Sequence, residues 1–346
     1  MPTLENDSLV FRFPHLEPNA RLVIDFQRTL RIPDTSKTYN LPPGLGRFPL
    51  CHVEDYAKSG LAKVAQFHSS NSAPRLPEVM VQRGGVMMPM WQSEALWMNF
   101  DTEGADYWDN FPVAIKIAAG KINALTGEPW QSGLRRRPQN YVVAPDQPWL
   151  DGFAVEKGII RQFVAMPLGQ GYSAEEQITG AAEWGGIQIV AIPLKPEAWA
   201  EYRANMMEPR IRFLALECVA IEPMGLGAGG RMKQDIYRDK LPKDAWDLES
   251  AERVFLHLVN ASNWLALTGE EPPTKPPTTE QYCEAGLPWF DYYGADQAAL
   301  PGSASLGSVV PVAQMYETKV GQPLPGSDDV ETESPVRIGP GAVPTQ

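Results

Sequence analysis

The run at residues 146–152 carries the residue types from which sugar-cleaving sites are built. Two carboxylates, Asp146 and Asp151, lie five residues apart on either side of Trp149. In glycoside hydrolysis one carboxylic acid protonates the leaving oxygen while a second carboxylate acts as nucleophile or base, and an indole ring can stack on the sugar. The same run fits a structural loop, with a turn at Asp146, a buried Trp149 and a solvent-facing Asp151. We favour the structural interpretation and keep sugar chemistry as the alternative.

Residues 225–230 match the spacing G-x-G-x-x-G, which lets a dinucleotide site bring its backbone close to a pyrophosphate. The residues that follow, 231–247, are charged and interrupted by Pro242, so they do not suit the helix that such a site requires. We therefore expect a flexible glycine loop and no cofactor. A weaker hypothesis is an anion site made by backbone N–H groups. Its candidate residues are Gly225, Gly227, Gly230 and Arg231.

Metal ligation is not indicated by the acids, histidines or cysteines. Four aspartates between residues 235 and 247 could supply oxygen ligands, but lysines and arginines alternate with them, which favours a salt-bridged surface. No two histidines are three or four residues apart, as a helical metal pair requires. The three cysteines are widely spaced, so neither a zinc site nor a disulfide framework is indicated and a reducing setting fits best. The histidines and cysteines are His15, His52, His68, His257, Cys51, Cys218 and Cys283.

Tryptophan and methionine gather in residues 86–100. Trp91 and Trp97 are six residues apart, so in a regular strand they share one face. Core packing is the ordinary role of such side chains. The alternative is an interface with another protein, because methionine-rich surfaces adapt to partners. The interface candidates are Trp91, Trp97, Met88 and Met90.

Short strands are expected to carry most of the fold. The 33 prolines and 29 glycines are spread along the chain and divide it into short elements. Residues 21–32 alternate between apolar and polar side chains, and residues 113–117 with 122–125 look like a hairpin. The fold class that we predict is α+β, predominantly antiparallel β with a few short helices. Further strands are expected at residues 9–13, 86–100, 159–166, 187–192 and 213–221.

Helix signals are fewer. Ser173 and Glu176 form the pattern of a capping box, and a short helix should follow it. Residues 247–267 are ambiguous: helical spacing of apolar residues competes with a strand-like run at 254–259, after which Asn260 could cap a separate short helix. Other helices are expected at residues 54–67 and 196–206.

The composition restricts the partners and the compartment. A net charge of −12 repels nucleic acid and anionic membrane surfaces. The only basic cluster, residues 135–137, is interpreted as a solvated turn. No apolar run approaches the ~20 residues that a spanning helix needs, and residues 1–7 lack the pattern of a secretory signal. We therefore expect a cytoplasmic protein with no nucleic-acid partner and no membrane insertion.

Two regions are expected along the chain. Residues 1–320 should form a β-rich body, with two subdomains and a boundary near 135–145 as an alternative. Residues 321–346 consist largely of proline, glycine, serine and acidic residues, and such a tail should be disordered unless something holds it. A neighbouring subunit could supply that contact.

At four segments, residues 120–130, 141–152, 161–180 and 232–246, the chain resembles a family of uncharacterised proteins whose members often carry the label "integral membrane protein". The resemblance is carried by Ala-Leu-Thr-Gly-Glu-Pro-Trp at 124–130, Asp-Gln-Pro-Trp-Leu-Asp-Gly at 146–152 and Gln-Phe-Val-Ala-Met-Pro-Leu-Gly at 162–169. It spans most of residues 80–330 and implies a shared, soluble fold with no settled activity and no catalytic residues. The hydropathy of this chain argues against the membrane label.

Two functions follow as hypotheses. The first is a non-enzymatic cytoplasmic protein that self-assembles as a homo-oligomer or acts as a scaffold. It depends on the Trp/Met-rich strands, the low-complexity tail and the missing catalytic motif. The second is a carbohydrate-active hydrolase or sugar-binding protein that uses Asp146 and Asp151 with Trp149.

Overall fold

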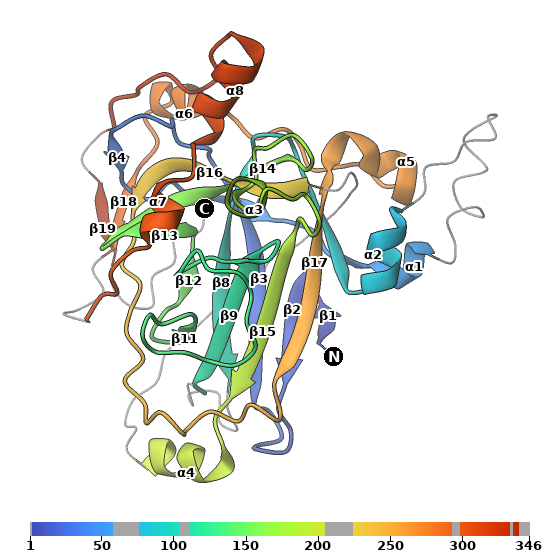
Figure 1. Ribbon diagram of the computed structural model, residues 1–346, viewed down its shortest axis with the longest axis vertical. Coiled ribbons are helices and arrows are strands. Elements are labelled where there is room, and N and C mark those ends of the chain that lie inside the picture. Colours follow the sequence, from blue (N-terminus) through green and yellow to red (C-terminus); the bar gives the residue numbers. More distant parts are fainter. Residues whose placement is uncertain are drawn as a thin grey trace.

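The fold is built mainly of antiparallel strands with short helices at the periphery (Figure 1). The computed structural model describes residues 2–57, 76–103, 111–204, 224–292, 298–332 and 335–338. The strands are β1 Thr3–Glu5, β2 Ser8–Arg12, β3 Arg21–Thr29, β4 Thr38–Tyr39, β5 Gly44–Arg47, β6 Cys51–His52, β7 Val86–Met90, β8 Ala95–Glu103, β9 Val113–Ala119, β10 Ile122–Asn123, β11 Val142–Ala144, β12 Trp149–Leu150, β13 Gly152–Glu156, β14 Ile159–Pro167, β15 Ile187–Pro193, β16 Met224–Lys233, β17 Glu252–Asn260, β18 Phe290–Tyr292 and β19 Val336–Ile338. The helices are α1 Val53–Ala57, α2 Glu78–Arg83, α3 Ala174–Thr179, α4 Pro196–Ala204, the 3-10 turn Ala261–Asn263, α5 Trp264–Thr268, α6 Thr279–Glu284, α7 Ala304–Gly307 and α8 Val312–Val320.

The long strands form one continuous ladder. Its order is β2, β3, β8, β14, β16, β17, β15, β9. The link between β16 and β17 is a single residue pair, Met224 with Leu258. These pairs are all antiparallel, as predicted. Parallel pairing occurs where β4 joins β16 and β7 joins β17. The predicted hairpin is confirmed, since β9 and β10 pair across a turn at Gly120, whose φ is +56°.

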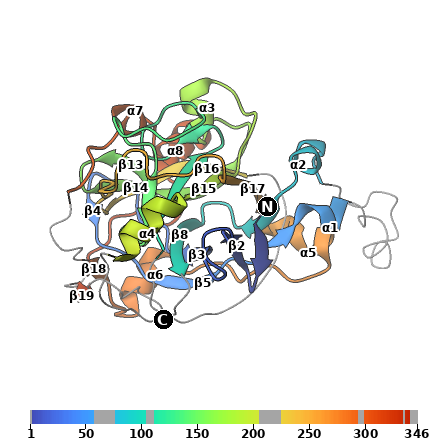
Figure 2. The same cartoon turned by 90° about the horizontal axis from the view of Figure 1, so that it is seen from below.

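The apolar alternation of β3 works as the sequence predicts. Leu22, Ile24 and Phe26 are completely buried, and their transfer out of water stabilises the fold by about 1.5 to 3 kcal/mol each. One hydrophobic cluster joins these side chains to Ile115 of β9 and Leu256 of β17. Buried residues before and after the region 135–145 therefore share one core. Figure 2 shows the β2–β3 and the β15–β17 parts of the sheet in separate layers.

The helix predictions are confirmed where the signal is local. Ser173 Oγ accepts a hydrogen bond from the backbone N–H of Glu176, whose side chain in turn accepts from the Ser173 N–H, so the capping box opens α3. The ambiguous segment 247–267 contains strand β17 and then, after the Asn260 cap, the 3-10 turn and α5. Helix α1 covers the first part of the helix expected at residues 54–67, and α4 begins at the expected proline. The rest of segment 54–67 and the strand expected at 213–221 lie outside the described residues.

The glycine run is a strand, so the prediction of a flexible loop is wrong. β16 pairs with β14 along its length, so its backbone is extended and does not form the curved nest of successive N–H groups that an anion site would need. The glycines allow close packing: a Cβ added at Gly227 would lie 2.6 Å from Val312 Cγ2 and 3.0 Å from the Tyr172 carbonyl oxygen. The strand contains all four residues considered for anion binding: Gly225, Gly227, Gly230 and Arg231.

The Trp/Met-rich strands β7 and β8 face the core rather than a partner. Met88, Met90 and Trp97 are buried among the side chains of this chain, so they leave no surface for an interface. Trp91 is half-buried, and its Nε1 donates to the Pro273 carbonyl oxygen at 2.8 Å. Trp91 therefore binds the proline-rich segment at residues 272–277, which follows α5.

The first part of the expected tail binds to its own chain. Arg31 Nη1 donates to Ser327 Oγ at 3.0 Å, and the Tyr39 hydroxyl donates to Asp329 Oδ1 at 3.0 Å. Strand β19 pairs in parallel with β18. A neighbouring subunit is therefore not needed to hold residues 325–332 and 335–338 against the body. None of the helices in the described part of the chain is long and apolar enough to cross a membrane.

Candidate functional site

Residues 234–239 form an extended wall that is held by side-chain amides. One edge pairs with residues 298–300, through Arg238 N to the Ala298 oxygen and Leu300 N to the Ile236 oxygen, at 2.9 and 2.7 Å. The other edge has no strand partner among the described residues. Its backbone groups are bound instead by glutamine side chains, whose carboxamide has the same donor and acceptor as a peptide group.

Two glutamines repeat one arrangement along that edge. Gln139 Oε1 accepts from Asp239 N at 2.9 Å and its Nε2 donates to the Tyr237 oxygen at 3.2 Å. Gln147 makes the same two contacts two residues earlier along the wall: its Oε1 accepts from Tyr237 N at 2.9 Å, and its Nε2 donates to the Asp235 oxygen at 3.3 Å. Each Nε2 also donates to the carbonyl oxygen of the residue two positions after its glutamine, which is Tyr141 for Gln139 and Trp149 for Gln147. The two glutamines thus replace a missing β-strand.

Asp151 is fixed behind the wall by two neutral donors. Its Oδ2 accepts from Trp149 Nε1 at 2.6 Å and from Gln234 Nε2 at 2.8 Å, while Gln234 Oε1 accepts from the Asp151 N–H at 3.0 Å. Burial raises the pKa of Asp151 to about 7, because the loss of water outweighs the Trp149 hydrogen bond. The expectation of a solvent-facing Asp151 is therefore wrong, whereas the expected burial of Trp149 is confirmed.

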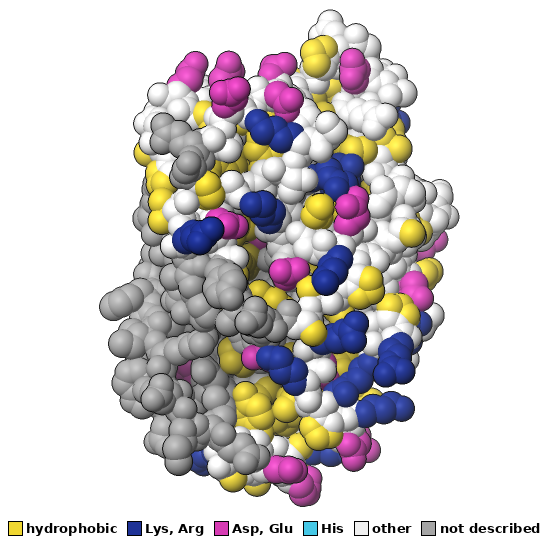
Figure 3. Space-filling model, turned by 90° about the vertical axis from the view of Figure 1, so that its left-hand side faces the viewer, with side chains coloured by type: hydrophobic (Ala, Val, Ile, Leu, Met, Phe, Trp, Pro, Cys, Tyr) yellow, Lys and Arg dark blue, Asp and Glu magenta, His cyan; other side chains and the backbone are white. Residues whose placement is uncertain are grey.

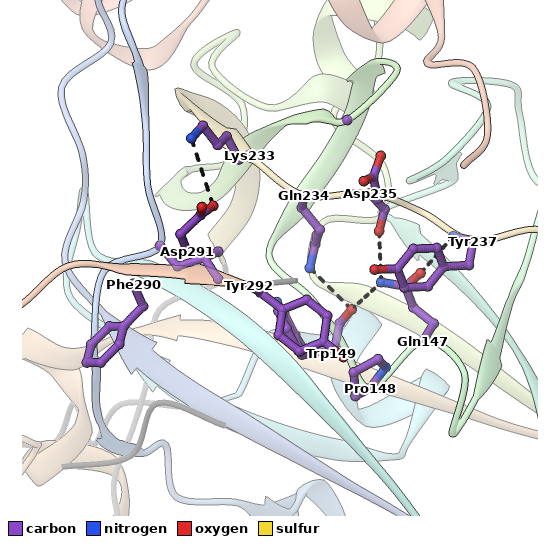
Figure 4. A pocket seen from close by; sticks show the side chains of 12 residues that line it. Gln147, Pro148, Trp149, Lys233, Gln234, Asp235, Tyr237, Phe290, Asp291 and Tyr292 are labelled. Carbon is purple, nitrogen blue, oxygen red and sulfur yellow. Dashed lines mark hydrogen bonds and ion pairs between the residues drawn. The ribbon is translucent and has the colours of Figure 1, made fainter. Parts of the chain in front are cut away.

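The wall and the Trp149 loop enclose a cavity of about 190 Å³, which we call the aromatic cavity (Figure 4). Figure 4 shows Lys233 and Asp291 on one side and Asp235 and Tyr237 on the other, with the Trp149 and Tyr292 rings between them. The remaining lining residues are Leu41, Gln147, Pro148, Gly158, Gln234 and Phe290.

The rings of the aromatic cavity are held in place by one another. Trp149 and Tyr292 meet edge to face, with centroids 4.5 Å apart and an interplanar angle of 84°. Burial and the neighbouring Tyr292 and Asp235 raise the pKa of Tyr237, so its hydroxyl stays protonated and can donate a hydrogen bond. Lys233 Nζ and Asp291 Oδ1 form an ion pair at 3.8 Å. The cavity thus combines aromatic surface with charged and hydroxyl groups.

The structure does not bring the two predicted carboxylates together in a cavity. Asp146 Oδ2 pairs with Lys240 Nζ at 3.0 Å, and the Asp146 side chain is 41% exposed. Asp151 is buried, and neither residue lines the aromatic cavity. A two-carboxylate mechanism at Asp146 and Asp151 therefore has no support in the geometry. Only Trp149 of the predicted trio belongs to the cavity.

Sequence reasoning missed the groups that build the wall and line the cavity. The run Gln-x-aromatic occurs at 139–141 and again at 147–149, and this spacing is the one signal that could have indicated the paired glutamines. Asp235 and Tyr237 were visible only as part of a charged segment. Within the described ranges, no group of three or more His, Cys, Asp and Glu side chains is arranged to hold a metal ion.

Comparison of the chain with family models, with curated proteins and with solved structures gave no match. The resemblance to a family labelled as membrane proteins stays a prediction.

Proposed function

We propose that this chain is a binding protein for a small carbohydrate or a similar polyhydroxylated molecule, held in the aromatic cavity. The proposal depends on one observation: aromatic rings, Asp235 and the Lys233–Asp291 ion pair line the same cavity. A sugar presents apolar C–H faces that pack on such rings, and hydroxyls that bond to carboxylate and ammonium groups.

The size of the cavity supports a small ligand. About 190 Å³ is less than the roughly 300 to 1,000 Å³ of pockets for drug-sized molecules. A single sugar unit, or the end of a longer chain, suits this volume better than an oligosaccharide. The glutamine-held wall supports a preformed site, because the groups that position Tyr237 are bound before any ligand arrives.

Binding is proposed rather than hydrolysis. Hydrolysis needs two carboxyl groups that flank the scissile bond, one of them able to donate a proton. Two carboxylates, Asp235 and Asp291, line the aromatic cavity. Asp291 is paired with Lys233. Asp151, whose raised pKa would suit an acid, is directed at Trp149 and Gln234 behind the cavity.

Saturation-transfer NMR with a panel of monosaccharides and polyols, followed by calorimetry of the best binder, tests the proposal. Tyr292→Ala should weaken binding about tenfold or more, because it removes a ring from the cavity. Tyr316→Ala on α8 is the matched control and should leave the affinity unchanged. The absence of any binder, or an equal loss in both variants, would refute the proposal. Release of a reducing sugar would replace binding by hydrolysis.

A further inference from the structure

A second, larger cavity lies on the other side of the wall. Its volume is about 600 Å³, within the range of pockets that hold cofactor-sized molecules. Ile236, Arg238 and Asp239 of the wall line it, together with Arg136 and Arg137 from the cluster interpreted above as a solvated turn. We call it the arginine cavity. On the molecular face in Figure 3, Lys and Arg side chains gather at the lower right, so the acidic excess is not spread evenly.

The acids that line the arginine cavity are already bound. Asp239 Oδ2 accepts from Arg136 Nη2 at 2.7 Å, from the Tyr141 hydroxyl at 2.5 Å and from Trp246 Nε1 at 3.0 Å. Glu156 Oε1 pairs with Arg231 Nη1 at 2.8 Å. Neither carboxylate therefore needs the other arginines of the lining.

Two guanidinium groups remain without a bound acid. The side chains of Arg137 and Arg238 form no hydrogen bond or ion pair with any described residue, and both are exposed at the cavity. An arginine fork binds carboxylate or phosphate oxygens in pairs. The rest of the lining is largely apolar, with Leu125, Ile236 and Leu300 among it.

We propose that the arginine cavity binds an organic anion, whose phosphate or carboxylate group is held by Arg137 and Arg238 and whose apolar body lies on Leu125 and Leu300. The proposal is independent of the sugar site, because the two cavities share only Gly158 in their linings and each is lined by different charged groups.

Calorimetry with three probes tests this proposal. Adenosine monophosphate carries a phosphate on an aromatic body, 2-naphthoate carries a carboxylate on one, and inorganic phosphate has no body. At least one of the two organic anions should bind with a Kd below about 1 mM and more tightly than inorganic phosphate. Which of the two binds better identifies the anionic group.

The double variant Arg137→Ala/Arg238→Ala should weaken binding at least about tenfold. Lys195→Ala/Lys319→Ala removes the same charge outside the cavity and should change the Kd less than about twofold. Circular dichroism verifies that both variants fold. If the alanine variant does not fold, Arg137→Lys/Arg238→Lys decides, because it keeps the charge and loses the forked geometry.

The proposal is overturned if neither organic anion binds to the wild type below about 1 mM, or if the lysine control weakens binding as much as the arginine variant. Sugar binding by the arginine variant should be unchanged, so failure of this inference is distinguishable from failure of the sugar site.

Discussion

The buried carboxyl of Asp151 should make the stability of this protein depend on pH in a defined direction. In the unfolded chain this carboxyl has its ordinary pKa of 3.8, whereas in the fold its pKa is about 7. The folded state therefore holds the proton over a range in which the unfolded state has released it. The stability that the protonated Asp151 side chain contributes is fully present below about pH 4 and is lost as the pH rises to about 7.

The size of this effect follows from the shift. About 3 pH units at about 1.36 kcal/mol per unit correspond to about 4 kcal/mol, a large part of the 5 to 15 kcal/mol typical of a folded domain. Asp151→Asn cannot ionise, and its carbonyl oxygen can still accept the bonds from Trp149 and Gln234. Relative to wild type, the variant should gain about 3 to 4 kcal/mol of unfolding free energy between pH 4 and pH 8.

Urea unfolding followed by tryptophan fluorescence at several pH values measures this difference. Other groups with shifted pKa values, Glu94 at about 7 and His257 at about 4, are present in both proteins and cancel. Asp146→Asn is the matched control, because its exposed pair with Lys240 contributes at most about 1 kcal/mol. Parallel pH curves for wild type and Asp151→Asn would refute the reasoning.

Three further changes test the packing and the polar contacts. Gln147→Ala leaves the Tyr237 N–H and the Asp235 carbonyl without the side chain that binds them and should lower the unfolding free energy by about 2 to 5 kcal/mol in urea titrations, with loss of sugar binding. Gly227→Ala should lose about 1 to 3 kcal/mol, seen as a lower Tm, whereas Gly307→Ala, whose nearest contact is an ordinary 3.7 Å, should be nearly neutral. Arg28→Met leaves the buried carboxylate of Glu94, with a pKa of about 7, without the donor at 2.7 Å. It should cost about 3 to 5 kcal/mol at pH 8 and less at pH 5, where this carboxyl is protonated; an equal loss at both pH values would contradict this explanation.

Features with a local signal could be predicted from the sequence. The alternation in residues 21–32 predicted β3, and the capping box at Ser173 and Glu176 predicted α3, because the groups that decide these elements are neighbours in the chain. The antiparallel character of the sheet followed in the same way, from many short apolar runs between turn residues.

Features that depend on distant partners could not be predicted. The glycines of β16 look like a loop until Val312, more than eighty residues later, is seen to pack against them. Apolar residues such as Met88 fit a core and an interface equally well in sequence, and only the fold decides between them. The close packing of Gly227 therefore excludes a glycine loop, and the burial of Met88 excludes this side chain from an interface.

The candidate site was predictable only in part. Trp149 was identified, but the orientation of Asp151 is set by Gln234, which lies 83 residues further along the chain. A glutamine is ordinarily an exposed residue. Nothing in the pattern indicated that Gln139 and Gln147 would be buried and would act as a strand.

A crystal structure of the protein soaked with its best-binding monosaccharide tests the central claim most directly. We predict the sugar in the aromatic cavity, with a ring face against Tyr292 and hydroxyls within hydrogen-bond distance of Asp235 and Lys233. Density for the sugar at another place, or an empty aromatic cavity at a saturating sugar concentration, would contradict the account.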